Sequence, residues 1–336
     1  MKTNNKGFVY VSILLTIWLI SACQDNGPND HSMLYAYFEV EDPTVSAGDS
    51  VAFKDQSLGH PSQWQWTFEG GTPATSTEQN PMVTYNASGQ YDVTLTVSTA
   101  ADSSSRIEEG YVFIISEDYL SEYIVASYPF DGSAEDEGSD NIDATNMGGV
   151  TFDGTDRDGN ENSTAVFSGS NALIVPDNPA FDFGTADFSI SVWLKTDETR
   201  KMMIWQEGGG GAHHPQAWFR IGHNTSDRLA RFTTEDADGG NYLNYGNGPD
   251  SGVGDGEWHH IVCVREGSTT RLYIDGAKQR ESVKSKKQNV TSDLDFKIGT
   301  QEGGGGYHTY FIGLLDDLII YDKALTDQEV ENLYKL

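Results

Sequence analysis

Two copies of one six-residue sequence, Gln-Glu-Gly-Gly-Gly-Gly, carry the residues most suited to chemistry; they occupy positions 206–211 and 301–306. Each copy follows a run typical of a β-strand and precedes histidine or aromatic residues. Four successive glycines cost conformational entropy to order and carry no side chains, so they indicate either close backbone approach or mobility. If both copies lie at one rim of a sheet, they would form a groove with backbone amides in its walls.

Such a groove would suit sugar rings, which present C–H faces to aromatic side chains and hydroxyl groups to polar acceptors. Glu302 would act as one acceptor. The residues expected to bind a glycan are Trp205, Glu207, His213, His214, Trp218, Tyr307, His308 and Tyr310. Two other interpretations remain open: plain flexible turns, and a transition-metal site of His and Glu. Adjacent side chains in an extended segment point apart, which weakens the metal hypothesis for His213 and His214.

Acidic residues gather in two segments that are far apart in the sequence. Four lie between positions 131 and 137, and an Asp-Asp pair occupies 316–317 in a strand that should pair near that first loop. Carboxylate oxygens at this density suit Ca²⁺. We therefore expect a structural calcium ion bound by Asp131, Asp136 and Asp316. The alternative is a solvated acidic loop, which is common in acidic proteins.

The elements that must position these residues are mostly strands. In the segment from Gly256 to Ala277, residues 258, 260, 262 and 264 share one face by the two-residue period, and Asp275-Gly276 is a turn dipeptide. Glycine is plentiful and helix-period patterns are nearly absent, which favours an all-β chain. The exception is near the C-terminal end, where Thr326 and Glu329 have the spacing of a helix capping box.

The pattern W-x-H-hydrophobic followed by L-Y-I-D-G, at 258–276, resembles the laminin-G-like (concanavalin-A-like) jelly rolls. The segments at 128–136, 156–169, 187–196 and 311–334 extend this resemblance. We expect such a jelly roll over residues 123–336, and the resemblance also implies a structural calcium ion.

That fold hosts binding proteins and β-glucanases alike. A β-glucanase needs closely spaced carboxylates on one strand. No strand of this sequence alternates Glu and Asp in that way, and no Ser–His–Asp arrangement, phosphate loop or dinucleotide fingerprint is present. We expect no catalytic residues and no enzymatic activity.

A smaller β-sandwich is expected over residues 34–117. Its run WQWTFEGGTP, followed by NPMVTYNASGQYDVTLTV, resembles a PKD domain. That family usually has an aspartate where Glu69 stands, so a metal role for the following turn is in doubt. The expected role of this domain is a spacer; contact with a protein or a glycan through exposed aromatic residues is the alternative.

The first 22 residues have the form of a targeting segment. Lys2 and Lys6 precede an apolar stretch at 8–20 that is too short to span a bilayer comfortably. Ile20-Ser21-Ala22-Cys23 resembles a bacterial lipobox, which implies cleavage before Cys23 and its lipidation. Residues 24–33 would then form a polar tether. The alternative is an ordinary signal peptide with a chance cysteine.

The chain is strongly acidic, with 21 Lys plus Arg against 51 Asp plus Glu and a formal net charge of −30. Such a balance disfavours nucleic acid and anionic lipid headgroups as partners. Only two cysteines are present, so a disulfide framework is not expected.

These features together predict a lipid-anchored protein of the outer membrane, at the cell surface. Its expected partners are a polysaccharide and an outer-membrane transporter complex for glycan uptake, and its architecture resembles the surface glycan-binding lipoproteins of Bacteroidota. The main alternative is an adhesion or scaffold protein that docks onto a protein partner. A third hypothesis is a hydrolase with an unrecognised site.

Overall fold

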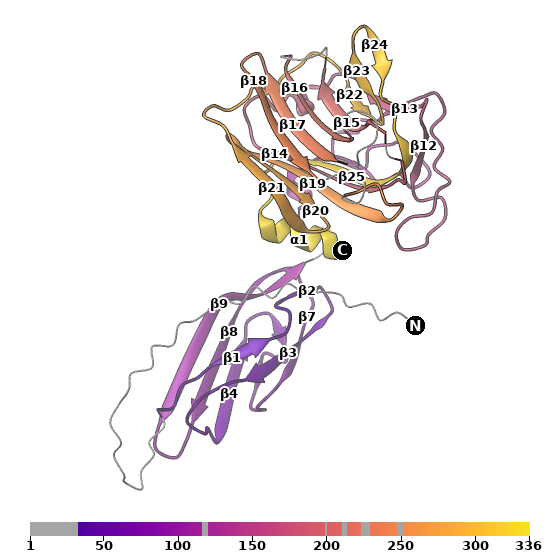
Figure 1. Ribbon diagram of the computed structural model, residues 1–336. Coiled ribbons are helices and arrows are strands. Elements are labelled where there is room, and N and C mark those ends of the chain that lie inside the picture. The colour runs from indigo at the N-terminus through magenta and orange to yellow at the C-terminus, as the bar shows by residue number, and fades with distance from the viewer. Residues whose placement is uncertain (1–32, 116–119, 199, 210–213, 223–228, 247–251) are drawn as a thin grey trace.

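The computed structural model describes residues 33–115, 120–198, 200–209, 214–222, 229–246 and 252–336. Over these residues the chain consists mainly of strands, and Figure 1 shows them gathered in two domains. The expectation of an all-β chain with two β-domains is confirmed. Cys23 and the apolar stretch at 8–20 lie outside the described residues. Among the residues described, no helix is long and apolar enough to cross a membrane.

The first domain is a sandwich of two sheets. One sheet has the order β1 (Phe38–Val40), β3 (Ser50–Asp55), β7 (Met82–Tyr85) and β5 (Gly71–Thr72). The other has the order β2 (Thr44–Ser46), β9 (Ser103–Ile115), β8 (Gly89–Ser98), β4 (Gln63–Phe68) and β6 (Thr75–Ser76). Alternation along β4 places Trp66 and Phe68 in the core, where their rings stack 5.6 Å apart.

The second domain also packs two sheets face to face. The helix-side sheet has the order β10 (Ile124–Tyr128), β25 (Ile312–Tyr321), β14 (Phe188–Lys195), β19 (Trp258–Glu266), β20 (Thr269–Ile274) and β21 (Ala277–Val283), with β12 (Ala165–Ser168) also paired to β25. The hairpin-side sheet has the order β11 (Thr145–Met147), β13 (Ala172–Val175), β22 (Phe296–Ile298), β15 (Met202–Gly208), β16 (Gln216–Ile221), β17 (Ala230–Asp236) and β18 (Gly239–Tyr245). A separate hairpin joins β23 (Gln301–Gly303) and β24 (Gly306–His308). Two short 3-10 helices, η1 (Ser121–Tyr123) and η2 (Pro179–Phe181), lie outside the sheets.

The core of the second domain lies between its two sheets, because alternate residues of each strand point inward. On β16 and β17 the inward residues include Phe219 and Phe232, and both are fully buried. The alternating residues of the same strands, such as Trp218 and Thr233, therefore lie on the outer face of the hairpin-side sheet.

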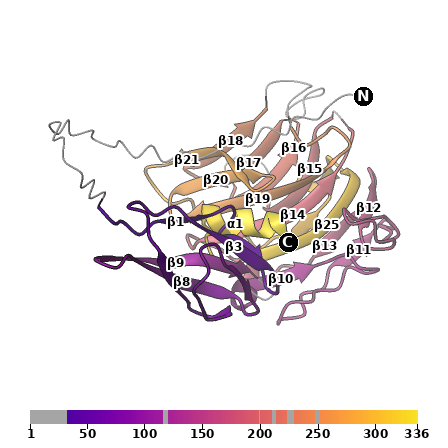
Figure 2. The same ribbon diagram turned by 90° about the horizontal axis from the view of Figure 1, so that it is seen from below.

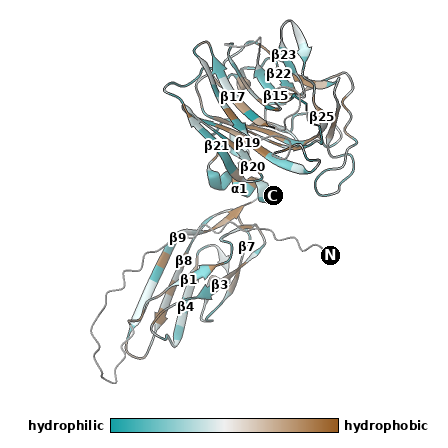
Figure 3. Ribbon diagram, in the orientation of Figure 1, coloured by the Kyte–Doolittle hydropathy of each residue, from teal (hydrophilic) through white to brown (hydrophobic). Residues whose placement is uncertain are grey.

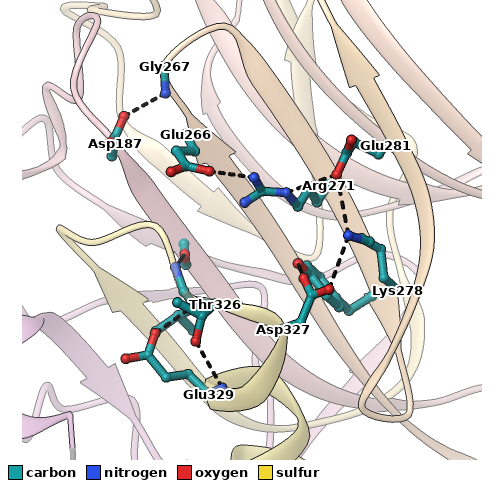
Figure 4. Close-up of polar contacts among 12 residues, drawn as sticks. Asp187, Glu266, Gly267, Arg271, Lys278, Glu281, Thr326, Asp327 and Glu329 are labelled. Carbon is teal, nitrogen blue, oxygen red and sulfur yellow. Dashed lines mark hydrogen bonds and ion pairs between the residues drawn. The ribbon is translucent and has the colours of Figure 1, made fainter. Parts of the chain in front are cut away.

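The helix α1 (Asp327–Lys335) covers the outer face of the helix-side sheet. Its N-terminus is closed by the predicted capping box: Thr326 Oγ1 accepts from the backbone N–H of Glu329, whose side chain accepts from the backbone N–H of Thr326 (Figure 4). Asp327 then fixes the helix to the sheet, because it accepts from the Tyr273 hydroxyl at 2.6 Å and pairs with Lys278 at 3.1 Å. The predicted helix is confirmed.

The same helix lies at the junction of the two domains, as Figures 1 and 2 both show. Gln328 donates to the hydroxyl of Thr44 at 3.3 Å, and Lys335 pairs with Asp42 at 3.2 Å. Both partners belong to the first domain, so α1 contacts it directly.

The edge strand β21 is predominantly hydrophilic, as Figure 3 shows. Charged side chains on an edge strand disfavour pairing with a strand of another molecule. Lys278 and Glu281 of β21 instead form ion pairs within the domain.

Candidate functional site

The two Gln-Glu-Gly-Gly-Gly-Gly copies meet at one rim of the hairpin-side sheet. The backbone N–H of Glu302 donates to Gln206 Oε1 at 2.8 Å. The buried ammonium of Lys297 joins the copies a second time, because it donates to the Gly208 carbonyl at 2.7 Å and lies 2.9 Å from the Glu302 carboxylate. The described parts of the two copies are therefore neighbours, as the groove hypothesis requires.

The second copy is more ordered than a flexible turn, since it forms the β23–β24 hairpin. Its turn consists of Gly304 and Gly305, whose φ angles are +61° and +94°. Two successive positive φ angles are typical of tight hairpin turns and favour glycine. The side chains of β24 are the half-buried Tyr307 and the exposed His308, whose Nδ1 lies 2.7 Å from the Thr309 hydroxyl. Tyr310 is half-buried just beyond this strand.

The prediction that Trp205 lines a groove is wrong. Trp205 is fully buried between the two sheets, and its indole stacks on Phe296 with 6.1 Å between ring centroids. Register pairs it with the inward residues Phe219 and Ile298. A bulge between Met203 and Trp205 sets this orientation, and the sequence gives no sign of it.

The prediction that Glu207 is an accessible acceptor is also wrong. Glu207 follows Trp205 by two residues, so it faces the same interior and is 2% exposed. Burial raises the pKa of its carboxyl to about 9, although Lys297 acts in the opposite direction. Glu207 is therefore protonated at neutral pH.

The raised pKa makes the stability of the second domain depend on pH. The unfolded Glu207 carboxyl ionises near its usual pKa of 4.5 and the folded one near 9, so stability falls as pH rises between these values. We expect Glu207→Gln to raise the free energy of unfolding at about pH 8 by about 5 kcal/mol and to leave it nearly unchanged at about pH 4. Urea unfolding across this range checks the prediction; parallel pH profiles for both proteins would contradict it.

The remaining predicted residues of the glycan site lie apart from Trp205. His213 lies outside the described residues, and His214 is exposed two residues before β16 begins. Trp218 points to the outer face of the hairpin-side sheet and is paired in register with Gln206. Its neighbours on that face were not predicted.

We call this outer face, over β15 to β18, the polar face. Its residues are Met203, Gln206, Gln216, Trp218, Arg220, Arg231, Thr233, Glu235, Tyr242 and Asn244, assigned by the register of the four strands. The alternation of polar and apolar residues along Gln216–Ile221 and Ala230–Asp236 is the sequence signal that could have found most of them.

A row of hydrogen bonds crosses the polar face beside the hairpin. Gln206 Nε2 donates to Gln216 Oε1 at 3.1 Å, and Gln216 Nε2 donates to Glu235 Oε2 at 3.1 Å. The hydroxyl of Tyr242 donates to Glu235 Oε1 at 2.7 Å. With the bond from Glu302 to Gln206, the row joins the hairpin to the far strand and fixes the orientation of each amide and carboxylate.

The Tyr242 ring forms an exposed platform at the end of this row. Its side chain is 45% exposed, and its ring lies over Gly240, where an added Cβ would come 2.4 Å from it. Thr233 lies directly opposite Tyr242 in register. The buried hydroxyl of Thr233 has no hydrogen-bond partner among the described residues. An aromatic face beside an unsatisfied hydroxyl and fixed acceptors is suited to a sugar ring.

Two of the three residues predicted to hold calcium, Asp136 and Asp316, have other partners in the structure. Asp136 accepts hydrogen bonds from the backbone N–H groups of Ser127, Gly138 and Ile142, each at 2.8 Å. Its carboxylate therefore stabilises the loop in which it lies. Over the described part of the chain, no three His, Cys, Asp or Glu residues are grouped to hold a metal.

Asp316 forms an ion pair with an arginine. Arg157 donates to Asp316 at 2.9 Å and to Asp317 at 2.8 Å, and so occupies the position expected for a cation. Burial, together with the charge of Asp317, raises the pKa of Asp316 to about 8, while Arg157 opposes this shift.

A cavity of about 440 Å³ on the helix side contains a serine–histidine pair. Ser191 Oγ and His260 Nε2 lie 2.8 Å apart, but His260 Nδ1 has no partner among the residues described. Burial lowers the pKa of His260 to about 3. A general base needs a pKa near the working pH and a group that orients it, so this pair is poorly suited to nucleophilic catalysis.

Both domains match models of known protein families. Residues 167–331 match the family model of the Concanavalin A-like lectin/glucanases superfamily, and residues 38–114 match that of the PKD domain. The chain therefore contains a PKD domain and a concanavalin A-like domain. No curated protein matches it.

Solved structures show the same fold at low identity. The binding domain of Paraclostridial Mosquitocidal Protein 1 is 19% identical with a TM-score of 0.51, and the match covers 64% of this chain and 52% of that one. The binding domain of Botulinum Neurotoxin DC, in complex with SialylT, is 13% identical with a TM-score of 0.50 and the same coverage. Domain 4 of AbnA, a GH43 arabinanase from Geobacillus stearothermophilus, is 20% identical with a TM-score of 0.48 over 63% of this chain and 98% of that one. The chain thus spans about half of each of the two toxin domains.

Proposed function

Given a PKD domain followed by a concanavalin A-like domain, we propose that the polar face of the second domain binds a polysaccharide outside the cell. One observation carries the proposal: the Tyr242 ring lies flat and exposed beside the unsatisfied hydroxyl of Thr233. The hydrogen-bonded row from Gln206 to Glu235 supports it, because fixed amides and carboxylates bind sugar hydroxyls without first having to be ordered.

The proposal extends to the place of the protein in the cell. Lipidation of Cys23 would anchor the chain at the outer-membrane surface, and residues 24–33 would act as a tether. The PKD domain would serve as a spacer that carries the binding domain away from the membrane. A glycan transporter complex in the same membrane is the partner that such a protein would serve.

Affinity electrophoresis tests the binding role. Residues 24–336 would be run through gels that contain a panel of soluble polysaccharides, beside Tyr242→Ala and Tyr35→Ala. Tyr35 is the matched control, since it is 48% exposed but lies in the first domain. We expect one glycan to retard the wild type and Tyr35→Ala, and Tyr242→Ala to bind about fivefold more weakly, because stacking on an aromatic ring contributes about 1 kcal/mol.

Tyr242→Phe separates stacking from the hydrogen bond to Glu235, and it should retain most of the binding. Equal retardation of Tyr242→Ala and the wild type would overturn the assignment to the polar face. Absence of retardation by every glycan would overturn the binding role itself and favour a protein partner.

A further inference from the structure

The cavity of about 440 Å³ on the helix side is separate from the polar face and has no part in the proposed function. One of its walls is aliphatic and is formed by three segments that are distant in the sequence. The residues of this aliphatic wall are Leu120, Ile124, Ile319, Leu333 and Leu336. The other lining residues are polar or aromatic. A cavity of this size with both kinds of wall can hold a small molecule that has an apolar body and polar groups.

Acidic side chains outnumber cations around this cavity. Asp131 and Asp317 line it, and Asp316 precedes Asp317 on β25. Among the described residues that line the cavity, Arg157 is the only cation, and its Nη1 donates to both Asp316 and Asp317. Even with Asp316 protonated, two carboxylates face one guanidinium. This part of the cavity therefore attracts a further cation.

The backbone is strained at both of the lining carboxylates. Asp317 has a φ of +43°, and Phe130, which precedes Asp131, has a φ of +63°. Such values are uncommon for residues other than glycine. At this point β25 shifts its register against β14, so the adjacent residues Asp316 and Asp317 both reach Arg157, which side chains that alternate along a regular strand would not do. Strained backbone of this kind is concentrated at ligand sites.

A neutral polar pair lines the same cavity on the other side of Trp193. Register places Asp316, Trp193 and His260 opposite one another on β25, β14 and β19, so this row spans about 10 Å. His260 is 2% exposed, its Nε2 lies 2.8 Å from Ser191 Oγ, and its Nδ1 has no partner among the residues described. When Nε2 donates to the serine, Nδ1 carries an unused lone pair. A buried polar atom without a partner is costly, so a donor supplied by a ligand would stabilise it.

Trp193 offers no open ring face to a sugar. The Arg157 guanidinium lies 4.6 Å from its ring centroid, and the rings of His260 and Tyr334 lie 4.9 and 5.7 Å from it. Stacking of a sugar needs an accessible aromatic face. The cavity is therefore better suited to a slender aliphatic molecule than to a sugar ring.

We propose that this cavity binds an aliphatic amine that carries a second hydrogen-bond donor. Its ammonium group would lie at Asp131 and Asp317, its carbon chain against the aliphatic wall, and its second donor on His260 Nδ1. The inference goes beyond the proposed function, because the polar face and this cavity belong to different sheets.

Isothermal titration calorimetry of residues 24–336 with matched small molecules tests the proposal. The molecule 5-aminopentan-1-ol has both groups, pentylamine lacks the hydroxyl, and pentane-1,5-diol lacks the ammonium. We expect 5-aminopentan-1-ol to bind, pentylamine to bind about fivefold more weakly, and the diol to bind at least about tenfold more weakly, since a hydrogen bond to a charged group contributes more than a neutral one. Calcium chloride is titrated separately, because carboxylates also bind Ca²⁺.

Asp131→Asn provides the variant, since Asp131 is exposed and its replacement should not unfold the domain. This variant should lose about tenfold in affinity for 5-aminopentan-1-ol. Asp293→Asn is the matched control, because it removes the same charge from an exposed position of the second domain outside the cavity, and it should have no effect.

Four results would overturn the proposal. The first is no binding of 5-aminopentan-1-ol, and the second is equal affinity for this amine and the diol. The third is equal losses in Asp131→Asn and Asp293→Asn, which would show that net charge controls the affinity. The fourth is binding of Ca²⁺ but not of the amine, lost in Asp131→Asn, which would assign the cavity to a metal ion. None of them affects the retardation by a polysaccharide, so the proposed function is tested separately.

Discussion

Trp205→Ala should destabilise the second domain by about 3–5 kcal/mol, which is the usual cost of removing a large aromatic side chain from a core. Trp205 is fully buried, its indole stacks on Phe296, and Phe232 lies 6.1 Å away between ring centroids. Alanine would leave a cavity that neighbouring strands of a closed sandwich cannot fill. Urea unfolding followed by near-ultraviolet circular dichroism measures this loss.

Trp64→Ala is the control, because Trp64 is only partly buried and belongs to the first domain. Its effect should fall on the transition of that domain and leave the second one unchanged. A Trp205→Ala protein with wild-type stability and weakened glycan binding would contradict the buried orientation and restore the groove role predicted for this residue.

Arg265→Met should cost about 3 kcal/mol or more, because it leaves several buried carbonyls without a donor. Arg265 is 1% exposed, and its guanidinium donates to the carbonyls of Phe183, Gly184, Ala186 and Gln288. These hydrogen bonds connect the loop that contains residues 183–186 and the loop that contains Gln288 to the C-terminal end of β19. Burial lowers the pKa of this group to about 10, so it remains charged at neutral pH.

The matched control is Arg271→Met on the adjacent strand. Arg271 forms ion pairs with Glu266 and Glu281 near the surface, as Figure 4 shows. Such pairs contribute at most about 1 kcal/mol. Thermal unfolding should therefore separate the two variants clearly, and equal melting temperatures would contradict the structural role assigned to Arg265.

Local patterns in the sequence predicted much of the fold. The two-residue period at 258–264 correctly places His260, Val262 and Val264 on one face, and the capping box at Thr326 forms as expected. Both signals depend on residues within a few positions of each other. The sequence could not show that α1 packs over those same residues, because that contact joins segments some 60 positions apart.

The candidate site was predicted only in part, and Trp205 and Trp218 show why. The two glycine-rich copies do meet, which the groove hypothesis had required without establishing, and Trp218 lies on the outer face but is only 6% exposed. Trp205 lies on the inner face because a bulge at 203–205 shifts the alternation along β15 by one residue. A bulge depends on pairing with the neighbouring strand, which a single sequence does not encode locally.

The calcium prediction stays untested, but two of its carboxylates have partners that the sequence did not show. Acidic residues at 131–137 and 316–317 were read as free ligands, but Asp136 is used by backbone N–H groups and Asp316 by Arg157. Local turn bonds and a distant arginine both compete for carboxylates. The number of acidic residues in a segment does not show that backbone N–H groups or a distant arginine will bind their carboxylates.

Amide hydrogen exchange with and without the retarding polysaccharide tests the central claim most directly. Glycan bound to the polar face should protect amides in Gln216–Ile221, Ala230–Asp236 and the hairpin at 301–308, and leave residues 33–115 unchanged. Protection confined to the first domain, or to the helix-side sheet around β14 and β19, would contradict the assignment of the binding site to the polar face.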